Sequence, residues 1–87
     1  MSDQLKDVRV LNGEIREVDF GKIYLKLKEY LDSHGITRNQ LSIKTGIKYQ
    51  VINKYYKNKT LERIDLVIVA KICYSLQCSL NDLLEWK

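Results

Sequence analysis

The sequence contains no proline and only four glycines among its 87 residues. Proline breaks helix interiors and glycine weakens them, so both shortages favour a helical protein. The two cysteines, Cys73 and Cys78, and the single histidine, His34, are too few for a disulfide framework or a structural zinc site. No apolar run approaches the roughly 18 residues that span a bilayer, and the first residues lack the apolar core of a secretory signal. We therefore expect no metal, no membrane contact and a cytoplasmic location.

The remaining composition is that of an ordinary single domain. Hydrophobic residues make up 45% of the chain and charged residues 30%, which is typical of a globular protein. The sequence has no nucleophile–base constellation, no glycine-rich phosphate loop and no paired-acid motif. We therefore expect no enzymatic activity and no cofactor. With no second domain to sense a small molecule, no such ligand is expected either.

The basic residues are concentrated in one part of the chain. The segment from Arg38 to Arg63 contains seven basic residues and one acid, Glu62, for a net charge of +6. The rest of the chain contains eight basic and ten acidic residues and has a net charge of −2. A basic segment in an otherwise slightly acidic protein is typical of a surface that binds a polyanion such as nucleic acid, although a solvated lysine face gives the same count.

The chain divides into residues 1–21 and residues 22–87. In the first part, two short alternating segments flank Asn12-Gly13, which predicts a β-hairpin. An isolated hairpin is marginal in water, so it should pack on the helices, pair with a second chain or remain disordered. The second part has the three- and four-residue spacing of amphipathic helices. The expected helices cover residues 22–34, 38–45, 48–57, 66–76 and 80–86.

The ends of these helices have recognisable capping residues. Gly35 should end the first helix, and Thr37 with Gln40 has the spacing of a capping box for the second. Asp65 should cap the fourth helix and Ser79 the last. We also expect Gly46 to form the turn before the third helix and Asn58 to end that helix in the left-handed conformation. Two tyrosines, Tyr30 and Tyr55, are expected in the core, and two more, Tyr24 and Tyr74, half-buried.

The second and third helices, joined by a short turn containing glycine, predict a helix-turn-helix motif. On the third helix the apolar and polar residues fall on opposite arcs of about 100° each. The polar arc contains no acid, unlike the usual solvent-facing helix surface. Its amides suit the N6 and N7 edge of adenine, and its lysines suit guanine. The residues of this arc are Gln50, Asn53, Lys54 and Lys57.

Two segments resemble the Cro and phage-repressor type helix-turn-helix family, also called the xenobiotic-response-element group. They are residues 35–60 (GITRNQLSIKTGIKYQVINKYYKNKT) and residues 65–86 (DLVIVAKICYSLQCSLNDLLEW). The resemblance extends over about residues 22–86. It implies a five-helix, repressor-like DNA-binding domain, usually dimeric, that recognises an inverted repeat. The matching positions include Gly35-Ile36-Thr37, Leu41, Gly46-Ile47 and Ile52.

The resemblance also implies roles for individual residues. The base-reading residues would be Tyr49, Gln50 and Lys54, with Asn53 as a further candidate. Phosphate contacts would come from the start of the second helix and from the basic residues around the third. This phosphate set is Arg38, Lys44, Lys48, Lys57, Lys59 and Arg63.

The chain departs from the family pattern at two places. Lys48 replaces the small hydroxyl residue common at the cap of the third helix, so that cap should be weak. Where many members carry an ion pair between the first and third helices, this chain has Leu31 and Tyr56, which predicts an apolar contact.

The functional expectation is a bacterial or phage transcriptional regulator, such as a repressor, that binds double-stranded DNA as a homodimer. The alternative is a protein-interaction module on the same fold, such as an antitoxin-like or adaptor subunit. The dimer seam would be the hairpin or the Leu83, Leu84 and Trp86 end. An acid-free third helix favours DNA, because an adaptor has no need of one.

Overall fold

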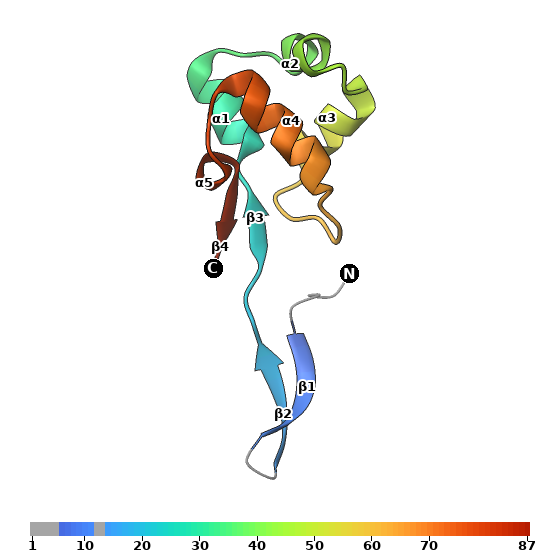
Figure 1. Cartoon of the computed structure of the whole chain (residues 1–87). Coiled ribbons are helices and arrows are strands. Elements are labelled where there is room, and N and C mark those ends of the chain that lie inside the picture. Colours follow the sequence, from blue (N-terminus) through green and yellow to red (C-terminus); the bar gives the residue numbers. More distant parts are fainter. Residues whose placement is uncertain (1–5, 12–13) are drawn as a thin grey trace.

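The computed structural model describes the backbone of residues 6–11 and 14–87, and the side chains from Val18 onward. Within these residues the chain forms five helices and four short strands (Figure 1). The helices gather at one end of an elongated molecule measuring 53 × 21 × 20 Å. The elements are β1 (Lys6–Leu11), β2 (Glu14–Asp19), β3 (Ile23–Leu25), α1 (Leu27–His34), α2 (Arg38–Thr45), α3 (Tyr49–Lys57), α4 (Leu66–Leu76), α5 (Leu80–Leu83) and β4 (Leu84–Trp86).

The five helices share one apolar core, as the expected fold class requires. Its most deeply buried side chains come from four different helices, so no helix can be removed without opening the core. Tyr55 belongs to this core and Tyr30 packs against it. Tyr24 is half-buried as predicted, whereas Tyr74 is 79% exposed and the prediction for it was wrong. The core residues are Leu25, Leu27, Leu31, Leu41, Ile47, Ile52, Tyr55, Val69, Ile72 and Leu83.

Most of the predicted helix ends are confirmed. Thr37 accepts a hydrogen bond from the backbone of Gln40, whose side chain accepts one from the backbone of Thr37, so α2 begins with a complete capping box. Gly35 and Gly46 end α1 and α2 with φ of 66° and 74°, the left-handed region that favours glycine. The Asp65 carboxylate caps α4 by accepting from the backbone of Val67.

Two predicted helices are too long, because their outer ends pair with each other as strands. α1 begins at Leu27 instead of residue 22, and α5 ends at Leu83 instead of residue 86. Residues 23–25 and 84–86 form the antiparallel β3–β4 sheet, with Ile23 opposite Trp86 and Leu25 opposite Leu84. The spacing of Ile23 and Leu27 fits a helix, but pairing between the two ends of the helical region satisfies these backbone groups instead.

The β3–β4 sheet is extended by close contacts between residues 20–22 and the end of the chain. Lys22 and Lys87 exchange two backbone hydrogen bonds, of 2.9 and 3.0 Å. Trp86 Nε1 donates to the carbonyl oxygen of Phe20 at 2.7 Å, although the Trp86 side chain is largely exposed. Gly21, with φ of 86°, leaves room for these contacts, since a Cβ there would lie 2.9 Å from Trp86 Nε1.

The end of α3 also differs from the expectation. Asn58 has φ of −100° and ψ of 130°, so it is extended and not left-handed. Its side chain serves the helix end in another way, because Nδ2 donates to the carbonyl oxygen of Lys54 at 2.8 Å. The amide side chain thus satisfies a carbonyl group at the end of α3, as backbone N–H groups do where a helix ends in the left-handed conformation.

The predicted hairpin is present. β1 and β2 pair antiparallel, from Lys6 opposite Asp19 to Leu11 opposite Glu14. The Asn12-Gly13 turn on which the prediction rested lies outside the described residues. Figure 1 shows the hairpin beyond the β3–β4 sheet, extending away from the helices instead of lying against them. No helix in the part of the chain that the structure describes is long and apolar enough to cross a membrane.

Candidate nucleic-acid interface

The helix-turn-helix motif is formed by α2, residues 46–48 and α3. Its turn is fixed by two side chains of α2: Ser42 Oγ donates to the carbonyl oxygen of Ile47, and Thr45 Oγ1 accepts from the backbone N–H of Ile47 at 3.1 Å. The Ile47 side chain is itself buried. These contacts hold α3 at a defined position relative to α2.

The two faces of α3 differ as predicted. Ile52 and Tyr55 are buried in the core. Gln50, Lys54 and Lys57 are exposed, and Tyr49 is 41% exposed at the start of the helix. Lys54 and Lys57 lie in the last turn, where the helix dipole favours cations. Lys48 caps the helix without a side-chain hydrogen bond, which agrees with the weak cap expected.

Arg38 connects the start of α2 to this surface. Its Nη1 donates to Oδ1 of Asn53 at 2.5 Å. The guanidinium carbon lies 4.4 Å from the ring centre of Tyr56 and 5.9 Å from that of Tyr49. Arg38 and Asn53 are both half-buried. The structure therefore brings together two residues that the sequence assigned to different tasks, one to phosphate and one to bases.

Tyr56 also links α3 to α1. Its hydroxyl donates to Oδ1 of Asp32 at 2.7 Å, and Oδ2 of the same carboxylate accepts from Lys28 Nζ at 2.8 Å. Hydrogen bonds from Lys28 and Tyr56 lower the pKa of Asp32, and the hydrogen bond to Asp32 raises the pKa of Lys28. Tyr56 packs against the core cluster that includes Leu31, and the predicted direct contact between these two side chains stays a prediction. The Tyr56 hydroxyl adds a polar contact that the sequence did not predict.

Four other residues predicted to contact phosphate are exposed and lie at the ends of α3 or in the loop that follows it. Lys48 and Lys57 lie at the two ends of α3, and Lys59 and Arg63 lie in the loop before α4. This loop is tied to its surroundings through its backbone. The N–H of Leu25 donates to the carbonyl oxygen of Lys59 at 2.7 Å, and the N–H of Asp65 donates to the Tyr55 hydroxyl at 2.8 Å.

Comparison with known proteins bears on this arrangement. A profile of the Cro/C1-type HTH DNA-binding domain matches residues 26–87. The chain belongs to this family. The crystal structure of the transcriptional regulator VanUg is similar to this Cro/C1-type domain, with a TM-score of 0.59 and 21% sequence identity. The match covers 83% of this chain and 96% of that one. No curated protein sequence matches this chain.

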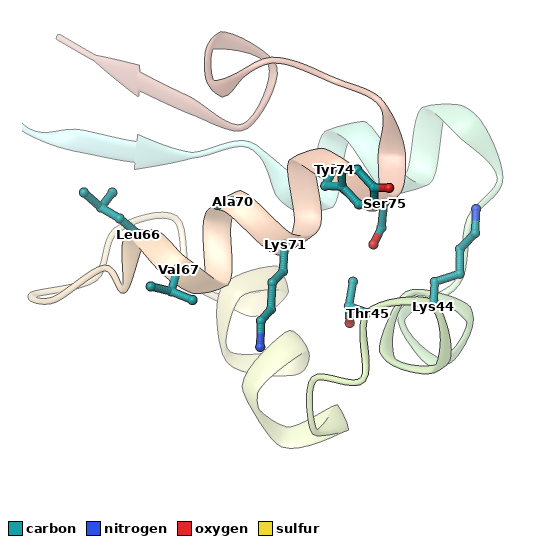
Figure 2. Close-up of a pocket in the computed structure, with 8 residues that line it drawn as sticks. All are labelled: Lys44, Thr45, Leu66, Val67, Ala70, Lys71, Tyr74 and Ser75. Carbon is teal, nitrogen blue, oxygen red and sulfur yellow. The ribbon is translucent and has the colours of Figure 1, made fainter.

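The Cro/C1-type domain has a second notable surface, formed by α4 and the end of α2. Leu66, Val67 and Tyr74 on α4 are each more than 60% exposed. Figure 2 shows Lys44 and Thr45 of α2 across from α4, with Lys71 and Ser75 on the α4 side. These residues line a groove of about 620 Å³. Lys44, predicted to contact phosphate, thus lies at the edge of an apolar groove.

The cysteines of this Cro/C1-type domain are half-buried free thiols. Burial, with Cys73 close by, raises the pKa of the Cys78 thiol to about 11, so this thiol is protonated at neutral pH. Among the described residues, no three His, Cys, Asp or Glu side chains come together in a group that could hold a metal ion.

Proposed function

We propose that this Cro/C1-type domain is a sequence-specific transcriptional regulator that inserts α3 into the major groove of DNA. The observation that carries the proposal is the exposed face of α3, which presents a tyrosine, an amide and lysines without any acid, next to a capped α2. A helix of this kind fits the major groove, where amide and ammonium groups recognise base edges.

The proposed division of labour follows position on the motif. Tyr49, Gln50, Asn53 and Lys54 would face the bases. Lys48, Lys57, Lys59 and Arg63 would contact phosphates on either side, and Lys44 would do so from the end of α2. Phosphate contacts fix orientation and supply affinity, whereas base contacts supply specificity.

We further propose that the domain acts as a homodimer. Two half-sites of an inverted repeat lie about one DNA turn apart, roughly 34–36 Å, and one copy of α3 reads only one of them. The N-terminal hairpin is the proposed seam, because a two-stranded sheet has open edges that a second copy can cover. The β3–β4 end with Trp86 is the alternative seam. Sedimentation of the full chain, and of the chain without residues 1–20, decides between them.

The test of DNA binding is a titration of labelled duplexes at several salt concentrations, after selection of sites from a random library. With about three to five phosphate contacts per copy, a dimer should give a log–log slope of roughly −5 to −9. Gln50→Ala and Lys54→Ala should each weaken the selected site by about 1–3 kcal/mol and relax base choice. Lys59→Ala should weaken all sequences alike. A flat salt dependence contradicts DNA binding.

The groove between α2 and α4 favours a second candidate function, that of a protein-interaction module. Its exposed apolar side chains are of the kind found in protein contacts. This function needs no phosphate contacts, so DNA binding with the slope given above decides against it as the main role.

A further inference from the structure

Arg38 stands at an unfavourable place for a cation. It is the first residue of α2, where the helix dipole disfavours positive charge, and the first turn of α2 contains no acid. Its guanidinium is compensated from outside the helix. Asn53 accepts its hydrogen bond, the rings of Tyr49 and Tyr56 lie beside it, and the charge of Arg38 contributes to the lowered pKa of Asp32.

In the hydrogen bond between Arg38 and Asn53, Arg38 can only be the donor. A guanidinium carries five donors and no acceptor, so the Asn53 atom that faces it must be the amide oxygen. The amide group is planar, and its nitrogen is therefore directed away from Arg38. On the acid-free face of α3, Asn53 then offers two N–H donors while its oxygen is engaged.

We propose that Arg38 is a positioning residue that orients the Asn53 amide so that Nδ2, and not Oδ1, faces the bases in the major groove. The proposal rests on the proposed DNA-binding function and deepens it. An asparagine with both amide atoms free prefers adenine, because it accepts from N6 and donates to N7. With Oδ1 held on the Arg38 side, Asn53 presents Nδ2 to the bases in place of the acceptor that N6 needs. A donor prefers guanine, which presents two acceptors, O6 and N7.

This role differs from a phosphate contact in ways that can be measured. A phosphate contact contributes equally to all sequences, and its removal lowers the salt slope by about one per site. A positioning residue changes base choice at one position and leaves the salt slope unchanged. It also acts only through Asn53, so its effect on base choice disappears when Asn53 is replaced.

The experiment compares binding sites selected from a random duplex library by the full chain and its variants. Asn53→Ala first identifies the base pair that Asn53 reads. Arg38→Met removes all donors but keeps an aliphatic stem to pack on Tyr56, and Arg38→Lys keeps the charge but not the planar fork. The control is Lys44→Met, on the same helix and outside the Arg38 contacts. Arg38→Met combined with Asn53→Ala completes the cycle.

We expect guanine at the Asn53 position in the wild type and a shift of about tenfold toward adenine in Arg38→Met. Arg38→Lys should fall between the two, the salt slope should stay constant, and Arg38→Met should have no effect on base choice in the Asn53→Ala background. Lys44→Met should leave base choice unchanged. Melting curves confirm that each variant is folded, and Arg38→Lys carries the test if Arg38→Met is not.

Three results overturn the proposal. The first is a uniform loss of affinity in Arg38→Met with a salt slope reduced by about one, which restores the phosphate role. The second is an unchanged base preference in Arg38→Met, and the third is no change of preference in Asn53→Ala. In these three cases the wild type still binds DNA and the proposed DNA-binding function stands, although the third removes Asn53 from the proposed base readers. A wild type that does not bind DNA removes both.

Discussion

The helix pair α2–α3 and the β3–β4 sheet hold the molecule together in different ways. α2 and α3 are joined by fully buried side chains, Leu41 and Ile52, which are both 0% exposed. In the β3–β4 sheet, main-chain hydrogen bonds connect the strands, and Trp86 is 68% exposed. Burial of apolar area is the larger source of stability, and a main-chain hydrogen bond contributes less because it replaces bonds to water. The two regions should therefore respond differently to substitution.

The largest effect is expected in the helix pair. Ile52→Ala removes a fully buried side chain and leaves a cavity, so it should lower the free energy of unfolding by about 2–5 kcal/mol. Leu66→Ala, at a position 67% exposed, is the matched control and should change it by about 0.5 kcal/mol or less. Urea unfolding measures both. Equal effects of the two variants would mean that α3 does not pack as described.

The next effect is expected in the sheet. Gly21→Ala places a Cβ 2.9 Å from both Trp86 Nε1 and the Lys87 carbonyl oxygen, at a φ of 86°. We expect a loss of about 1–3 kcal/mol and a change in the fluorescence of Trp86, the single tryptophan. Gly46→Ala, with φ of 74° and nothing within 4 Å, isolates the backbone cost. An unchanged Trp86 spectrum in Gly21→Ala would contradict the contacts between residues 20–22 and the chain end.

A smaller effect is expected at the start of α2. Thr37→Ala removes the side-chain oxygen that accepts from the backbone of Gln40 at 3.0 Å. The loss should be about 1 kcal/mol, as for other N-cap substitutions. Thr60→Ala, in the exposed loop, serves as the control in the same thermal melts. If the two threonines prove equivalent, the capping box contributes nothing to stability.

The smallest effect concerns pH. Because Lys28 and Tyr56 lower the pKa of Asp32 below its ordinary value of 3.8, the folded state holds this carboxylate ionised more readily than the unfolded state does. The stabilisation is complete above that value and is lost as pH falls through the lower folded pKa. NMR titration of Asp32 should show the lowered pKa and its partial return in Tyr56→Phe. No return would remove Tyr56 as a cause.

The same contrast between regions explains which parts could be predicted from the sequence. The ends of α2 and α4 were predictable, because Thr37, Gln40 and Asp65 act on residues two or three positions away. The β3–β4 sheet was not, because Ile23 and Trp86 lie at opposite ends of the helical region and local spacing says nothing of their pairing.

The candidate interface also has one part that could be predicted from the sequence and one part that could not. The acid-free face of α3 was visible in the sequence as helical periodicity. The hydrogen bond from Arg38 to Asn53 was not, because it spans 15 positions and depends on how α2 crosses α3. The available signal was an arginine at the first position of a helix without an acid nearby, where a cation needs a partner from elsewhere.

Leu25 connects the β3–β4 sheet to the loop between α3 and α4. Leu25 pairs with Leu84 in the β3–β4 sheet. Its backbone N–H donates to the carbonyl oxygen of Lys59, in the loop between α3 and α4. This hydrogen bond therefore couples the position of β3 to that of the backbone at Lys59. In the proposed complex, where Lys59 contacts a DNA phosphate, a ligand that shifted β3 would be thermodynamically linked to DNA, and each would change the affinity of the other by the same factor.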